Sequence, residues 1–166
     1  MDQKKYIVFW LKLKASSLHR KFASMETKTY QLFVYGSLRS GFRNPAYQYL
    51  TQYFHLLGEA LVKGKFYDKG PYPVAIPTSE ELFINGELYL FNNPDEFKWV
   101  IEQLDDYEGL NVEAGETPMY KRELVTVFKE GVPSQAWIYW FNGSVEGMKE
   151  ISTGDVLKYL QEKNKP

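Results

Sequence analysis

The sequence contains no cysteine and only two histidines, His19 and His55. The absence of cysteine excludes disulfides, thiolate nucleophiles and cysteine-ligated metals. So few histidines argue against a multi-histidine zinc centre, and a Ser-His-Asp triad would have to use one of the two. Few side chains therefore remain for metal-based or nucleophilic catalysis.

Excess charge and long apolar runs are also lacking. The formal net charge is −1, which gives no strong field toward nucleic acid or acidic membranes. The apolar run at residues 7–11 is too short to span a bilayer, and Lys12 and Lys14 interrupt it. No small-residue cleavage site follows, as a secretory signal would require. We therefore expect a cytoplasmic protein without nucleic-acid or membrane partners, and a basic N-terminal appendage at residues 1–28.

The chain does have aromatic residues and enough length for one core. It has 166 residues, of which 17% are aromatic, and this composition suits an antiparallel β-rich domain. Strands are expected at residues 30–35, 54–67, 74–76, 84–91, 119–128 and 135–141, and helices at residues 46–53, 93–109 and 155–163. Gly58 and Gly64 predict bends or bulges in the second strand. Without regular strand–helix alternation, the class is α+β with a curled sheet or small barrel.

Residues 31–41 read as a buried strand that leads into a tight loop at Gly36. Gly36 can adopt backbone angles closed to other residues, and its lack of a side chain lets a ligand approach the main chain. Ser37 adds a hydroxyl, and Arg39 and Arg43 add positive charge. Main-chain N–H groups of such a loop can hold a small anion or a polarised carbonyl. A turn that only changes the chain direction explains the same pattern.

Residues 104–109 place the acids Asp105, Asp106 and Glu108 at the C-terminal end of a predicted helix. That end carries partial negative charge, and acids three positions apart repel. Both effects favour the protonated carboxyl and make an ionised one a better base, which marks Glu108 as a candidate catalytic group. Alternatively, Asp105 and Asp106 point into water, or Glu108 pairs with Arg122 or a lysine.

Three motifs in this order resemble the gamma-glutamylcyclotransferase-like family: Tyr-Gly-Ser-Leu-Arg at 35–39, Leu-Asp-x-Tyr-Glu-Gly at 104–109 and Tyr-x-Arg at 120–122. The similarity covers about residues 30–142. It implies an α+β fold with a small mixed or antiparallel β-barrel, flanked by a few helices, and a cavity at one end. We accordingly expect this domain at residues 29–145, followed by a C-terminal helical tail at residues 146–166.

The resemblance further implies an enzyme that converts a small γ-glutamyl amine or amide into 5-oxoproline and a free amine, without a metal or organic cofactor. The resemblance implies that the single acidic residue of the family's site corresponds to Glu108. The residue chemistry agrees, because one carboxylate can take a proton from the attacking α-amine and return it to the leaving nitrogen. The developing oxyanion needs fixed N–H donors, which a glycine-bearing loop can supply.

The expected substrate-binding residues are Tyr35, Gly36, Ser37, Leu38, Tyr120, Arg122 and Tyr139. The amides of residues 36–38 would cradle the substrate, and Tyr35 would form the cavity floor. Arg122 would anchor the loop, neutralise a carboxylate or form a structural ion pair. Tyr139 would donate a hydrogen bond to the substrate or pack in the core.

Two alternatives to an enzyme fit the same sequence. One is a domain that binds a small anionic metabolite at the barrel mouth without turnover. The other is an interaction domain built on exposed aromatics such as Trp137 or Trp140. The loops at residues 68–73 and 111–118 are expected to shape the outer cavity and so to select the leaving group. The sequence indicates no particular leaving group or oligomeric state.

Overall fold

The computed structural model describes residues 29–42 and 44–165. The predicted N-terminal appendage, residues 1–28, and the expected loop cation Arg43 lie outside the described residues. None of the described helices is long and apolar enough to cross a membrane.

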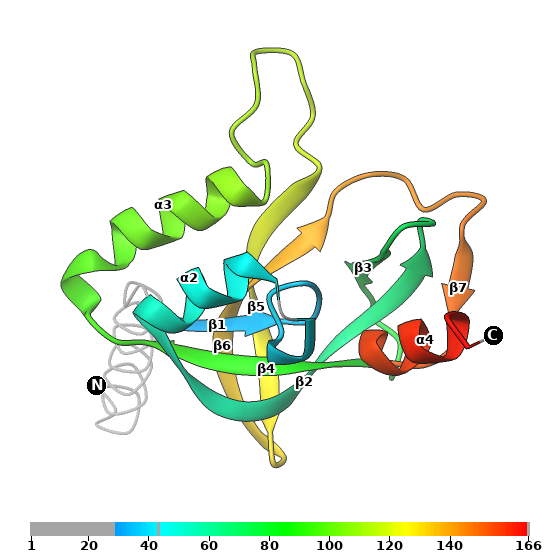
Figure 1. Ribbon diagram of the computed structural model, residues 1–166, viewed down its shortest axis with the longest axis horizontal. Coiled ribbons are helices and arrows are strands. Elements are labelled where there is room, and N and C mark those ends of the chain that lie inside the picture. Colours follow the sequence, from blue (N-terminus) through cyan, green and yellow to red (C-terminus); the bar gives the residue numbers. More distant parts are fainter. Residues whose placement is uncertain (1–28, 43, 166) are drawn as a thin grey trace, which may run out of the picture.

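Five strands close into a mixed barrel in the order β2-β4-β1-β6-β5, and β5 pairs with β2 to complete it (Figure 1). The strands are β1 (Gln31–Val34), β2 (Phe54–Asp68), β4 (Phe83–Phe91), β5 (Tyr120–Lys129) and β6 (Val132–Phe141). The β1–β6 pair is parallel, whereas the other barrel pairs are antiparallel. The predicted α+β barrel is confirmed.

Strand β2 is one continuous element that serves both the barrel and a small extension. A register shift between Leu56 and Gly58 bends it, and Gly58 has a φ of +133°, so the predicted bulge is present there. The second expected bend, at Gly64, lies in regular pairing. The far end of β2 pairs with β3 (Pro73–Pro77) on one side and with β7 (Lys149–Ile151) on the other.

The helices lie on the outside of the barrel, with α2 and α3 together and α4 beside β3 and β7 (Figure 1). They are α2 (Pro45–Tyr53), α3 (Phe97–Tyr107) and α4 (Val156–Lys163), with the short 3-10 helices η1 (Ser40–Phe42) and η2 (Pro94–Glu96). The Asn93 side chain caps η2, and α3 follows directly. The helix predicted from Asn93 is therefore split into two elements.

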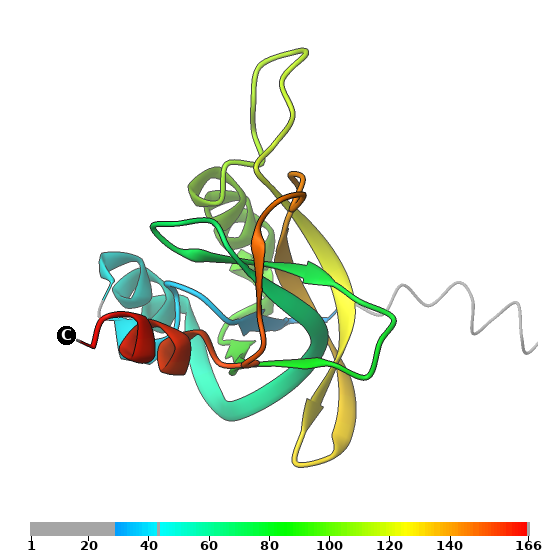
Figure 2. The same ribbon diagram turned by 90° about the vertical axis from the view of Figure 1, so that its right-hand side faces the viewer.

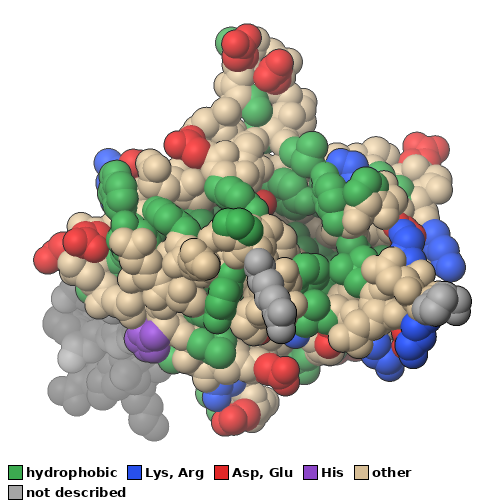
Figure 3. Space-filling view, in the orientation of Figure 1, with side chains coloured by type: hydrophobic (Ala, Val, Ile, Leu, Met, Phe, Trp, Pro, Cys, Tyr) green, Lys and Arg blue, Asp and Glu red, His purple; other side chains and the backbone are tan. Residues whose placement is uncertain are grey.

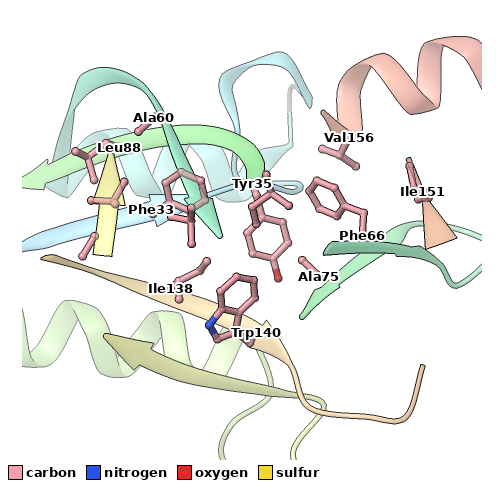
Figure 4. Packing of buried hydrophobic residues seen from close by; sticks show 14 residues of the cluster. Phe33, Tyr35, Ala60, Phe66, Ala75, Leu88, Ile138, Trp140, Ile151 and Val156 are labelled. Atoms are coloured by element: carbon pink, nitrogen blue, oxygen red, sulfur yellow. The ribbon is translucent and has the colours of Figure 1, made fainter. Parts of the chain in front are cut away.

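Side-chain alternation in β1 separates two cores. Phe33 and Tyr35 point into the barrel interior, where they join Ile138 and Trp140 (Figure 4). Leu32 and Val34 point outward and pack under α2 and α3. This alternation brings the ring of Tyr35 inside the barrel just before the chain leaves the strand at Gly36.

The C-terminal residues expected as a helical tail contain the predicted helix, α4, but also the strand β7, which was not predicted. Ile151 of β7 and Val156 of α4 are buried and pack beside Phe66 of β2 (Figure 4). Figure 2 shows β7 and α4 lying along the barrel. These residues complete the core.

Trp140 is fully buried in the barrel, and Trp137 is partly buried beneath Arg122. The hypothesis of an interaction surface built on an exposed Trp140 is therefore wrong. The large aromatic serves the packing of the barrel interior instead.

Candidate active site

A pocket of about 540 Å³ opens where β1 ends, between the C-terminal end of α3 and the helix α4. Figure 3 shows hydrophobic side chains bordering a hollow near the centre of this face. Seven of the eight residues predicted for the site line it: Tyr35, Gly36, Ser37, Leu38, Glu108, Tyr120 and Tyr139. Arg122 is not among the lining residues.

Only one of the two loops expected to shape the outer cavity does so. Pro71 and Tyr72, from the loop before β3, line the pocket. Residues 111–118 contribute no lining residue, and this loop projects away from the barrel between α3 and β5 (Figures 1 and 2). The expectation for the second loop is therefore wrong.

The loop after β1 presents its main chain to the pocket. The N–H of Arg39 donates to the carbonyl of Gly36 at 2.9 Å, which closes a turn. Within the described part of the chain, the N–H groups of Gly36, Ser37 and Leu38 donate to no other group. Because residues 36–38 also line the pocket, their three amides are candidate donors for a carboxylate or a carbonyl oxygen.

Gly36 leaves room beside the main chain and does not adopt a left-handed backbone conformation. Its φ lies outside the left-handed region, so the expectation of special backbone angles is wrong. A Cβ atom built on Gly36 would have no neighbour within 4 Å. The space that a side chain would take thus belongs to the pocket, as close approach of a ligand to the main chain requires.

Glu87 of β4 binds Ser40, at the end of the loop, and so fixes the loop in place. The sequence did not predict this role, because an acidic residue in a strand can lie on the surface as well as at the edge of the core. The carboxylate is buried and accepts from the N–H of Ser40 at 3.0 Å and from its hydroxyl at 2.6 Å. The hydroxyl of Tyr89 donates to the same carboxylate at 2.7 Å. Three donors satisfy the charge and fix the loop.

Glu108 is the C-terminal cap of α3 and lines the pocket. Its N–H donates to the carbonyl of Leu104, and Gly109 follows with a φ of +69°, which stops the helix. Burial raises the pKa of Glu108 to about 7. A raised pKa was predicted from the helix end and the neighbouring acids, but the cause is desolvation inside the pocket.

The structure also shows whether Asp105 and Asp106 point into water and whether Glu108 pairs with Arg122. Arg122 does not pair with Glu108: its guanidinium lies 3.4 Å from Asp105 and stacks over the ring of Trp137 at 4.9 Å. Asp105 is largely buried and does not point into water. Asp106 is exposed, as one alternative expected, and accepts a hydrogen bond from the side chain of Asn111.

The phenols around Glu108 are neutral groups. The hydroxyl of Tyr139 donates to Asp105 at 2.8 Å, and the buried hydroxyl of Tyr35 donates to the main-chain carbonyl of Tyr139. Burial is the main cause that raises the pKa of Tyr35, Tyr120 and Tyr139 far above the ordinary tyrosine value. The proton of Tyr139, for which donation to the substrate was one of two expected roles, is therefore donated to Asp105.

No cluster of three or more metal-ligating side chains occurs among the residues that the structure describes. His55 lies on the exposed surface, where it bonds to Asn92, and it is not a pocket residue. His19 falls outside the described residues.

A small closed barrel whose first strand ends in a glycine loop facing a buried carboxylate is a gamma-glutamyl cyclotransferase-like architecture. The family described as "Gamma-glutamyl cyclotransferase, AIG2-like" matches residues 32–158, and the chain belongs to this family. The match continues past residue 142, where the similarity was expected to end, and includes β7 and the start of α4.

Relatives support this membership. The chain is 30% identical over 128 residues to the gamma-glutamylcyclotransferase family protein YtfP of Escherichia coli, covering 76% of this chain and 96% of YtfP. The solution structure of E. coli YtfP has a TM-score of 0.52 at 28% identity, covering 78% and 97% of the two chains. The crystal structure of YkqA from Bacillus subtilis has a TM-score of 0.58 at 26% identity over 81% of this chain, which spans only 42% of YkqA.

Proposed function

We propose that this protein converts a γ-glutamyl amine or amide into 5-oxoproline and a free amine, with Glu108 as the group that moves the proton. The observation that carries the proposal is the shared pocket: Glu108, with a pKa of about 7, lines the same cavity as the amides of residues 36–38. A carboxylate with this pKa can act as a base and then as an acid near neutral pH.

The reaction needs no nucleophile from the protein. Glu108 takes a proton from the substrate's α-ammonium group, and the freed amine attacks the γ-carbonyl carbon to form the ring C–N bond. Glu108 then returns this proton to the leaving nitrogen as the original amide C–N bond breaks. The second proton of the attacking nitrogen passes to the released amine, which departs as an ammonium ion. Charge and atoms balance without a co-reactant.

The loop supplies the complementary part of the site. Its amides would hold the α-carboxylate or the developing oxyanion, and their fixed positions would supply the near-attack geometry. Tyr35, beneath the loop, would form the floor, and Tyr120 would form a side wall. Both fill the roles of substrate-positioning groups in this proposal.

The test is 5-oxoproline release from a panel of γ-glutamyl amines and amides, with parent, Glu108→Gln and Glu102→Gln proteins. Glu102 is an exposed acid on the same helix, so its variant controls for loss of one charge. We expect Glu108→Gln to keep the fold but lose at least about 100-fold in rate, as removal of a general base does. Parent-like turnover by this variant would refute the mechanism.

The same panel separates an enzyme from a metabolite-binding domain. Binding of γ-glutamyl compounds without release of 5-oxoproline from any of them, together with unchanged affinity in Glu108→Gln, would favour the binding domain. Release that depends on Glu108 would favour the cyclotransferase.

A further inference from the structure

Two tyrosines that line the pocket donate their hydroxyl hydrogen bonds to acceptors within the protein. Tyr139 donates to Asp105 at 2.8 Å, and Tyr35 donates to the main-chain carbonyl of Tyr139. A phenol has one proton to donate and can also accept. Once that proton is committed, the oxygen can only accept hydrogen bonds from a ligand. Both tyrosines are among the residues that line the pocket, whereas Asp105 is not.

Asp105 fixes the direction of the Tyr139 hydrogen bond. Its second oxygen lies 3.4 Å from the guanidinium of Arg122, and its side chain is only 13% exposed. Burial raises the pKa of Asp105, but the hydroxyl of Tyr139 and the charge of Arg122 favour the ionised form, in which the carboxylate can only accept. The hydroxyl of Tyr139 must therefore point its proton toward Asp105 and its lone pairs elsewhere.

Tyr35 and Tyr139 line the same pocket as Glu108. A phenol acceptor in the same pocket as a carboxylate suits a ligand group with more than one N–H donor. The loop amides provide the opposite preference, since they can only donate. The pocket thus has an ammonium-binding side and a carboxylate-binding side.

We propose that Asp105 is a positioning residue which, through Tyr139, makes the pocket select a γ-glutamyl group whose α-amine is free and protonated, and directs that ammonium group toward Glu108. The identity of the ligand rests on the proposed function. The selectivity itself follows from the fixed direction of the hydrogen bonds.

The test uses a ligand pair that differs only in the α-amine: γ-glutamyl methylamide and glutaric acid monomethylamide. Binding is measured by calorimetry in a Glu108→Gln background, which prevents turnover and removes the contribution of the Glu108 charge. We expect the amine ligand to bind at least about 10-fold more tightly, which corresponds to about 1.4 kcal/mol.

Asp105→Asn is the decisive substitution. The asparagine oxygen would face Arg122 and its NH2 group would face Tyr139, so the Tyr139 proton would turn toward the pocket. The preference for the amine ligand should then fall to within about 3-fold of unity, while the deamino ligand binds no more weakly than before. Asp106→Asn, one residue further and exposed, is the matched control and should keep the full preference.

Tyr139→Phe provides a second route if Asp105→Asn fails to fold, because it keeps the main-chain carbonyl that Tyr35 uses. It too should abolish the preference. Retention of the preference in either variant, or an equal loss of affinity for both ligands, would overturn the inference.

The two proposals can fail separately. A parent protein that releases 5-oxoproline yet binds both ligands equally in the Glu108→Gln background would overturn the inference alone. A parent that releases none, but whose preference for the amine ligand disappears in Asp105→Asn, would overturn the proposed function and support the inference.

Discussion

Arg39 and Asp155 form an ion pair at 3.1 Å that joins the glycine-bearing loop to the beginning of α4. The Arg39 side chain is buried, and Asp155 also accepts hydrogen bonds from the N–H groups of Leu157 and Lys158 as the helix cap. One carboxylate therefore both starts α4 and compensates a buried cation of the loop. The position of the pocket's amide donors depends in this way on residues far along the chain.

Removing that carboxylate should destabilise the protein in two separable steps. Asp155→Ala removes the helix cap and leaves Arg39 buried without its partner, so we expect a loss of about 3 kcal/mol or more in the free energy of unfolding. Asp155→Asn keeps a capping oxygen and loses only the charge, so its loss should be smaller. Denaturant unfolding measures both, and equal stability of Asp155→Ala and the parent would contradict the assignment.

Gly36→Ala should separate ligand binding from folding. Because the new methyl group meets no protein atom within 4 Å, we expect a change in stability within about 0.5 kcal/mol. The methyl group would instead occupy pocket space and raise KM for γ-glutamyl substrates.

Gly86→Ala is the contrasting control. A Cβ atom there would lie 2.4 Å from the Phe33 ring and 2.4 Å from the Val34 carbonyl oxygen, so this variant should lose about 1–3 kcal/mol or more. Thermal unfolding together with the 5-oxoproline assay distinguishes the two. A Gly36→Ala protein with unaltered KM would show that the ligand does not approach this main chain.

The rate should depend on pH through Glu108. In the proposed mechanism the ionised carboxylate is the base, and burial raises the pKa of Glu108 to about 7. The value of kcat/KM should therefore fall about tenfold per pH unit as the pH drops below about 7, because a shrinking fraction of the enzyme holds the ionised group. A pH profile between about pH 5 and about pH 8 measures this. A midpoint near the ordinary glutamate value of 4.5 would contradict a desolvated base.

The same burial predicts that Glu108 lowers stability when ionised. Its pKa is about 7 in the folded protein and 4.5 ordinarily, so the folded state binds the extra proton between these values. Stability should thus fall as pH rises through this window, by on the order of 3 kcal/mol.

The neutral Glu108→Gln side chain removes that cost. Above about pH 7 this variant should be more stable than the parent, and near about pH 4 the two should be alike. Thermal unfolding at both pH values provides the measurement, with Glu102→Gln as the control on an exposed site. A variant that is equally stable or less stable at the higher pH would argue against burial of an ionised Glu108.

The elements with strong local signals were predictable. Asn44 and Asn93 each precede proline and cap the helical turn that follows, and Gly58 marks the bulge in β2. Strand β7 has only three residues and no side-chain pattern, so only its pairing with β2 defines it. The closure of the barrel likewise depends on the long-range pairing of β2 with β5.

Most residues that line the candidate pocket were predictable, but the contacts that hold them in place were not. The loop at residues 36–38 and Glu108 come from their motifs, and the structure brings them to one pocket. The partners that hold them, Glu87 and Asp155, are 47 and 116 positions from the loop residues they contact. No local rule links residues so far apart.

Tyr139 contacts one neighbour through its hydroxyl and another through its main chain, since it donates to Asp105 and accepts from Tyr35. The effect of a substitution at position 139 should therefore depend on which residue stands at position 105, whereas the main-chain contact with Tyr35 survives the substitution. Any redesign of this pocket for a different ligand would have to vary positions 105 and 139 together, because a library that changes them one at a time would miss the compatible combinations.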